Sequence, residues 1–201
     1  MRIDPENKAL DGLTTFLAFI ALNVIFLVSC VPIVTIGAAV SALDEVTIRY
    51  ADEERGRPVA GYFPAFGRNF VQATLLMLCL LVPAAALVFS GLFWLFNPEP
   101  FVTALAAIAF LAAAYAFAAF LHAMALVAAY RNSFRQTLKN ALLLPAAEPI
   151  RTLGLLLIPV TIGCLAVIFP PFVLVVATIG CSLGAYGSAF LFRAVHARHR
   201  D

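Results

Sequence analysis

Five apolar runs, each about as long as a bilayer is thick, constrain what this chain can fold into. A helix needs about 20 largely apolar residues to cross the hydrocarbon core, and each run meets or nearly meets that length. None of the runs alternates apolar and polar residues as the strands of a membrane barrel do. The five runs are Leu13–Val31, Phe70–Phe96, Phe101–Tyr130, Leu153–Phe169 and Phe172–Phe192.

The composition agrees with a membrane bundle. Of the 201 residues, 63% are hydrophobic and 12% are charged, whereas about a quarter of a soluble domain is charged. The chain therefore lacks the polar surface that a water-soluble domain needs. We expect one all-α transmembrane domain over residues 1–201, with the lipid bilayer as its surroundings. The formal net charge of +2 is too small to indicate nucleic acid as a partner.

The basic residues predict which connections lie in the cytoplasm. All thirteen lysines and arginines lie before the first run, between runs one and two, between runs three and four, or after run five. The connections "FNPEPF" and "FPPF" have none. Cytoplasmic loops carry the excess of Lys and Arg, so residues 44–69, residues 131–151 and the C-terminus are expected inside. The two proline turns are then outside.

The segment after Pro32 decides whether the chain has five or six helices. Pro32 disfavours continuation of the first helix, and Thr35 can cap a new one. Apolar residues then recur at helical spacing on one face, with Asp44, Glu45 and other polar residues on the opposite face. A sixth, amphipathic helix places the basic N-terminal residues inside as well. We therefore favour six helices in three hairpins, each with a proline-bearing outer turn.

A second interpretation of this segment stays open. One long helix from Leu13 to Leu43 could be kinked at Pro32, with Asp44 and Glu45 emerging into the cytoplasm as ordinary boundary charges. In the six-helix interpretation, the same carboxylates must face other helices or a wet cavity, because lipid does not solvate them.

Four features carry a resemblance to a known family. They are Asn23 in the first run, "PIVTIGAAVSAL" (Pro32–Leu43), "FPAFGRNFVQAT" (Phe63–Thr74) and "YRNSFRQTLKNALLL" (Tyr130–Leu144). In order and spacing they resemble the YesL family of uncharacterised bacterial membrane proteins, over about Leu13 to Phe192. Members of that family are often associated with carbohydrate-uptake genes, which implies an accessory role in sugar import. The acidic pair Asp44-Glu45 departs from the uncharged or aromatic residues that the family more usually has.

Three groups of residues are candidates for function or for helix packing. Polar side chains within or beside the apolar runs form a candidate intramembrane site: Asn23, Asp44, Glu45 and His122. Basic and amide residues on the expected cytoplasmic side form a candidate surface for anionic lipid or a docking protein: Arg68, Asn69, Arg131, Arg135 and Lys139. Small residues at four-residue spacing form a candidate packing face, within the bundle or between two copies: Gly180, Gly184 and Ser188. For Asn23 and His122, a bond to a neighbouring helix is the plainer interpretation.

Enzyme signatures are absent from the sequence, which has no Walker A loop, no HExxH and no Gly-x-Ser-x-Gly elbow. We expect no cofactor, no metal site and no catalytic residues. The function expected is a non-enzymatic accessory or assembly component of carbohydrate uptake in the bacterial plasma membrane, with transporter components as partners and both termini cytoplasmic. The alternative is a small solute carrier or channel with a polar cavity lined by the second helix.

Overall fold

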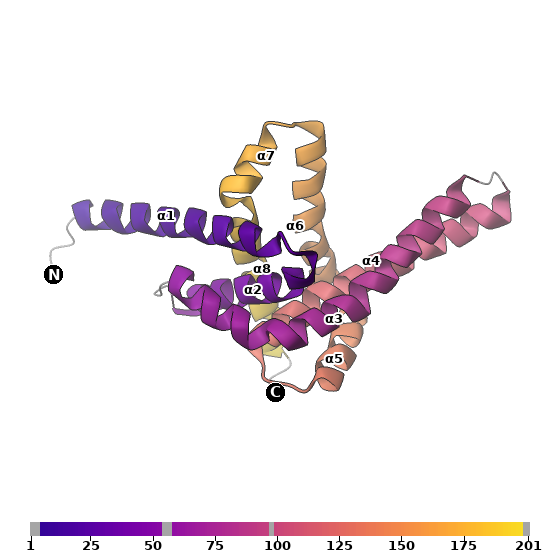
Figure 1. The fold of residues 1–201 in the computed structure, drawn as a ribbon, viewed down its shortest axis with the longest axis horizontal. Coiled ribbons are helices and arrows are strands. Elements are labelled where there is room, and N and C mark those ends of the chain that lie inside the picture. The colour runs from indigo at the N-terminus through magenta and orange to yellow at the C-terminus, as the bar shows by residue number, and fades with distance from the viewer. Residues whose placement is uncertain (1–4, 54–57, 97–98, 199–201) are drawn as a thin grey trace.

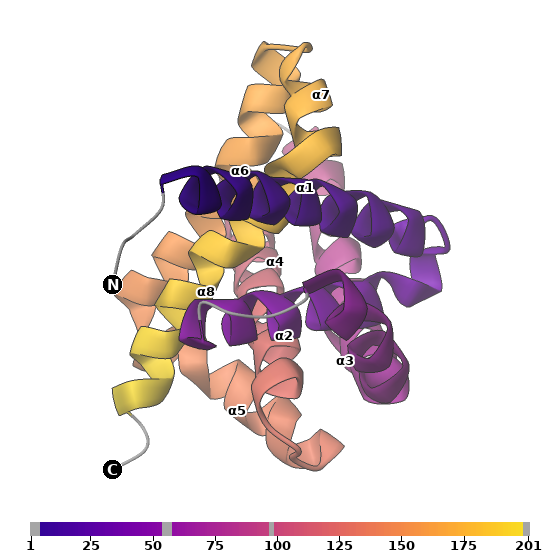
Figure 2. The ribbon, with the colours of Figure 1, turned by 90° about the vertical axis from the view of Figure 1, so that its left-hand side faces the viewer.

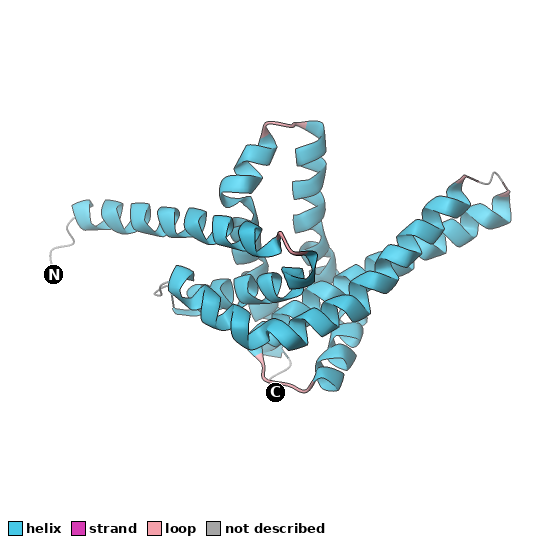
Figure 3. Cartoon of the chain, in the orientation of Figure 1, coloured by secondary structure: helices cyan, strands magenta, loops and turns pink. Residues whose placement is uncertain are grey.

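The computed structural model describes residues 5–53, 58–96 and 99–198, and within these ranges the chain is helical without any strand (Figure 3). Most of the helices pair into three hairpins, with α5 joining the second hairpin to the third (Figure 1). The predicted all-α bundle, with its extra amphipathic helix after Pro32, is confirmed. The elements are α1 (Pro5–Cys30), η1 (Ile33–Thr35), α2 (Ile36–Glu53), α3 (Pro58–Leu95), α4 (Pro100–Ala129), α5 (Phe134–Ala147), α6 (Pro149–Ile168), α7 (Phe172–Val175), η2 (Val176–Gly180) and α8 (Cys181–Arg198).

The chain turns back on itself at Pro32. Helix α1 ends at Cys30, Pro32 has extended backbone angles (φ −77°, ψ 117°), and α2 then runs back beneath α1 (Figure 1). The single kinked helix from Leu13 to Leu43 is therefore wrong. Thr35 does not cap α2 as expected, because its hydroxyl donates to the carbonyls of Ser29 and Pro32 instead. Thr35 therefore bonds to the end of α1 and to the turn that follows it, and does not cap the start of α2.

Among the residues that the structure describes, five segments are long and apolar enough to cross a membrane, and each overlaps one of the five apolar runs of the sequence. They are Gly12–Cys30, Pro58–Leu95, Phe101–Ala129, Pro149–Ile168 and Phe172–Phe192. Large side chains such as Phe89, Leu111 and Val167 are exposed on these segments, as contact with lipid requires. The protein is thus an integral membrane protein. Helix α2 is not one of the five.

The two connections predicted to be cytoplasmic are helical over most of their described length. Between Asp44 and Asn69, the described residues belong to α2 or to the first turns of α3, which begins at Pro58. Proline is well tolerated at the first helical position, where its missing N–H has no intrahelical partner to lose. Between Arg131 and Arg151, α5 occupies most of the length, and the hydroxyl of Ser133 caps it by accepting from the backbone N–H of Gln136.

Helix α2 lies at the centre of the molecule, against α3, α4 and α8 (Figure 2). Its residues from Gly37 to Thr47 are buried apart from Val40, which is half-buried. Gly37 allows α2 to approach α3 closely, because a Cβ atom at this position would lie 2.6 Å from the carbonyl oxygen of Ala73. The small residues that follow Pro32 therefore let this helix enter the bundle, and within Gly37–Thr47 the polar residues are buried together with the apolar ones.

The second and third hairpins diverge toward their outer ends (Figure 1). A group of charged and amide residues lies where α2, the beginning of α3 and the end of α4 meet. That region holds the charged residues considered next.

Candidate functional site

Glu45, on α2, is the centre of a group of charged and amide side chains. Its side chain is 4% exposed. One carboxylate oxygen, Oε1, accepts from Nη2 of Arg49 at 2.7 Å and from Nη2 of Arg68 on α3. The other, Oε2, accepts from Nδ2 of Asn69 at 3.0 Å. We call Glu45, Arg49, Arg68 and Asn69 the Glu45 cluster. A buried carboxylate is tolerated when its charge and its lone pairs are both matched in this way.

The cluster depends on helical spacing within α2 and on the neighbouring position of α3. Ser41, Glu45 and Arg49 follow each other at intervals of four and so share one face of α2. The amide of Asn69 also donates to Oγ of Ser41 at 3.2 Å, which ties a second turn of α2 to α3. Sequence reasoning had assigned Glu45 to an intramembrane site and Arg68 and Asn69 to a docking surface; the structure brings all three together.

A polar pocket of about 290 Å³ adjoins the Glu45 cluster. The cluster and Gln72 form one wall, and the end of α4 with the connection to α5 forms the other (residues 127–132). Gln72 anchors that connection, because its Nε2 donates to the carbonyl of Asn132 at 3.0 Å and to Oγ1 of Thr137 at 3.1 Å. Gln72 was missed by sequence reasoning, although its spacing of four from Arg68 places it on the same face of α3.

Asp44 is buried next to Glu45 in the sequence but points to a different side of α2. It is 7% exposed, and among the residues that the structure describes its carboxyl group makes no hydrogen bond or ion pair. The hypothesis that Asp44 is shielded among helices agrees with this burial.

Asn23 holds α1 against the π-helical turn η2. Its Nδ2 donates to the carbonyls of Val176 and Ala177 at 3.0 and 2.8 Å, and its Oδ1 accepts from the backbone N–H of Ser182 at 2.9 Å. A π turn frees backbone groups from the regular helical ladder, and the amide of Asn23 satisfies them. Its position is thus that of a helix-joining residue.

His122 joins α4 to α6. Its ring is fully buried, with Nε2 at 2.9 Å from Oγ1 of Thr152, and it meets the ring of Phe192 edge-on. Asn23, Glu45 and His122 therefore bond to partners on different helices. The structure does not bring these three candidates into one site.

The remaining candidates divide between the pocket, α5, η2 (which ends at Gly180) and α8. Arg131 is exposed and lines the pocket, whereas Arg135 and Lys139 are exposed on α5 and do not line it. On α8, Gly184 packs against α6, since a Cβ there would lie 3.3 Å from both Ile158 and Ile162. The Ser188 hydroxyl donates to the carbonyl of Gly184 in its own helix. The stripe of small residues therefore packs within the bundle at Gly184.

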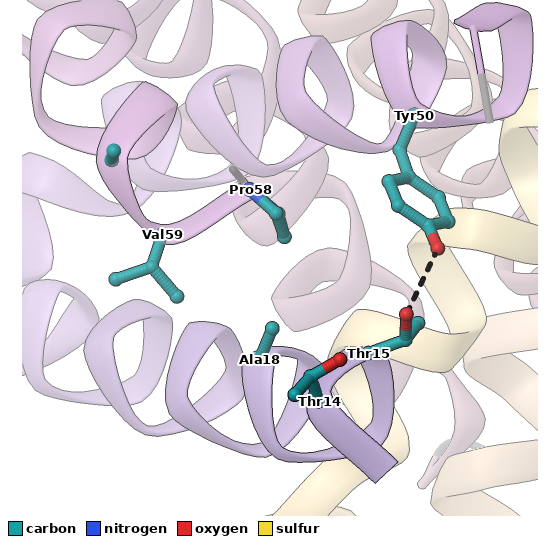
Figure 4. A pocket seen from close by; sticks show the side chains of 7 residues that line it. Thr14, Thr15, Ala18, Tyr50, Pro58 and Val59 are labelled. Carbon is teal, nitrogen blue, oxygen red and sulfur yellow. Dashed lines mark hydrogen bonds between the residues drawn. The ribbon is translucent and has the colours of Figure 1, made fainter. Parts of the chain in front are cut away.

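A second pocket, of about 460 Å³, lies between α1, the end of α2 and the start of α3 (Figure 4). Figure 4 shows the hydroxyl of Tyr50 pointing to Thr15, at 3.4 Å between the two oxygens. The other lining residues are Thr14, Ala18, Pro58, Val59 and Ala60. None of the seven is charged, so this pocket offers less for recognising a polar ligand than the pocket beside Glu45.

Comparison with known families places the Glu45 cluster in a recognised domain. Residues 19–92 match the family described as "Protein of unknown function, DUF624". This domain characterises YesL-like bacterial membrane proteins, so the match confirms the predicted resemblance. It covers α2 and nearly all of α3, including every member of the cluster. No curated protein and no solved structure matches the chain.

Proposed function

We propose that the protein is a non-enzymatic accessory or assembly component of a carbohydrate-uptake system in the bacterial plasma membrane. The DUF624 match and the resemblance to the YesL family support this proposal, because the association of that family with carbohydrate-uptake genes implies such a role. In the proposed orientation both termini and the Glu45 cluster are cytoplasmic, and the proline turns are on the outer side.

The observation that carries the proposal is the rigid, partly exposed set of cations around Glu45. The carboxylate fixes Arg49 and Arg68, yet their side chains remain 66% and 37% exposed. Arg131, Arg135 and Lys139 continue the basic surface along the connection to α5 and along that helix. Arginine is favoured at protein interfaces because its planar group of donors recognises carboxylates. Here Glu45 already orders the side chains of Arg49 and Arg68. A cytoplasmic transporter component is the partner proposed for this surface.

The alternative, a solute carrier or channel, also has one observation in its favour. The pocket beside Glu45 is polar and is lined by α2, as a carrier with a cavity along its second helix requires. The accessory role is preferred because Glu45, Asn23 and His122 are each satisfied by separate neighbours. Carriers instead tend to gather buried polar groups around one central site.

Photo-crosslinking in living bacteria tests the proposed contact. A photoreactive amino acid replaces Arg131 or Arg135 near the proposed docking surface. In matched controls it replaces Phe96 or Val167, which are exposed near the proline turns. A transporter component should crosslink from positions 131 and 135 and not from 96 and 167. Deletion of the gene should also slow uptake of the sugar that this transporter carries. Crosslinks confined to the outer positions, or normal uptake of every sugar tested after deletion, would refute the accessory role.

A further inference from the structure

The pocket beside Glu45 has more positive than negative charge in its walls. Three arginines, Arg49, Arg68 and Arg131, line it together with one carboxylate, Glu45, so positive charges exceed negative charges by two. We infer that the pocket is a binding site for a phosphate-bearing anion. This site does not depend on the proposed role in carbohydrate uptake.

The arginines keep donors for such a ligand. Each guanidinium has five N–H groups, and the contacts of Arg49 and Arg68 with Glu45 are each made through Nη2. Planar guanidinium groups bind phosphate oxygens through paired hydrogen bonds. Because Glu45 already holds both side chains in place, little conformational entropy is lost when an anion binds. Glu45 thus acts as a positioning residue for the two cations.

The opposite wall supplies a third cation and lies close in the sequence to the start of a helix. Arg131 and Asn132 belong to the connection that Gln72 holds against α3. Helix α5, of 14 residues, begins at Phe134, just beyond this wall. The N-terminal end of a helix has a positive potential that adds to the attraction for an anion within the first turn.

The size of the pocket indicates that the part of the ligand that enters it is a small group. Its volume of about 290 Å³ is near the lower limit of about 300 Å³ for small-molecule sites. A phosphate with a short polar substituent fits this space. Two sources share that chemistry: the headgroup of an anionic phospholipid, and a phosphorylated solute such as a sugar phosphate.

Titration calorimetry of the purified full-length protein in an uncharged detergent tests the site and separates its sources. The soluble probe is glucose 6-phosphate, with glucose as the uncharged control. The lipid probe is dihexanoyl phosphatidylglycerol, with zwitterionic dihexanoyl phosphatidylcholine as its control. We expect at least one phosphate-bearing anion to bind more tightly than its control, and more weakly as salt is added, because salt screens exposed charges. Binding of the lipid probe alone identifies a headgroup site, and binding of glucose 6-phosphate alone identifies a solute site.

Substitutions locate the binding. Arg131→Gln should lower the affinity for the anion by about fivefold or more, which corresponds to about 1 kcal/mol of binding free energy. Arg49→Gln, from the other wall, should weaken it as well. Arg135→Gln removes the same charge from α5 outside the pocket and should leave the affinity within about twofold; thermal unfolding shows that each variant is folded. The inference is overturned if neither anion binds, if glucose binds as tightly as glucose 6-phosphate, or if Arg135→Gln weakens binding as much as Arg131→Gln.

Discussion

Glu45 and Arg68 form an ion pair across the interface of α2 and α3, although they are 23 positions apart in the sequence. The carboxylate is buried and the guanidinium is about one-third exposed. The pair therefore joins a buried helix to the surface of the molecule. It lies two turns along α2 from Gly37, where the same two helices approach each other closely.

Loss of the carboxylate should destabilise the protein more than loss of either arginine. Glu45→Ala removes the shared partner of Arg49, Arg68 and Asn69 and should lower the free energy of unfolding by about 2–4 kcal/mol, less than a fully buried pair loses because the arginines reach solvent. Arg49→Ala should cost about 0–1 kcal/mol because its side chain is mostly exposed, and Arg68→Ala should lie between. Thermal unfolding in one detergent gives the order. An equal effect of Glu45→Ala and Arg49→Ala would show that the carboxylate is not buried as described.

Gly37→Ala should loosen the packing of α2 on α3. The added Cβ would lie 2.6 Å from the backbone oxygen of Ala73 and 2.9 Å from Cβ of Met77, neither of which is the end of a flexible side chain. We expect a loss of about 1–3 kcal/mol, as for other overpacked positions. Gly67→Ala is the matched control, because an added Cβ there meets nothing within 4 Å. The account is contradicted if both variants unfold at the wild-type temperature.

Asn23→Ala should destabilise the contact between α1 and η2. The change leaves two carbonyls of η2 and the backbone N–H of Ser182, at the start of α8, without their side-chain partner, at a cost of about 1–3 kcal/mol. Ser188→Ala removes a hydroxyl that bonds only within its own helix in the described structure, and it should change stability by less than about 0.5 kcal/mol. The measurement is thermal unfolding of both variants beside the wild type. Equal effects would show that Asn23 does not join the helices.

The features that the sequence predicted are those set by local chemistry. The length of each apolar run follows from bilayer thickness, and the turn at Pro32 follows from the missing N–H and the ring of proline. Burial of Asp44 could be predicted because lipid solvates a carboxylate poorly. These features need no knowledge of how one helix crosses another.

The partners of the polar residues could not be predicted in the same way. Whether Glu45 meets Arg68 on α3 or His122 on α4 depends on how α2 is rotated against both helices, and the close approach at Gly37 fixes α2 against α3. The role of Gln72 depends on where the connection to α5 folds back. The contact of Asn23 depends on the π turn η2, for which the sequence has no clear signal. One site was therefore expected where the structure has separate contacts.

Sugar flux through liposomes tests the accessory role most directly. The purified protein is reconstituted alone, and the fraction of molecules with the Glu45 cluster facing the outside of the liposome is determined. Uptake of labelled sugar is then compared with that of empty liposomes. The same measurement is repeated with sugar phosphate, because the pocket beside Glu45 has an excess of positive charge. The account predicts no flux of either compound above that of empty liposomes. Flux that depends on the protein and is reduced by Arg131→Gln would contradict the accessory role and establish a carrier instead.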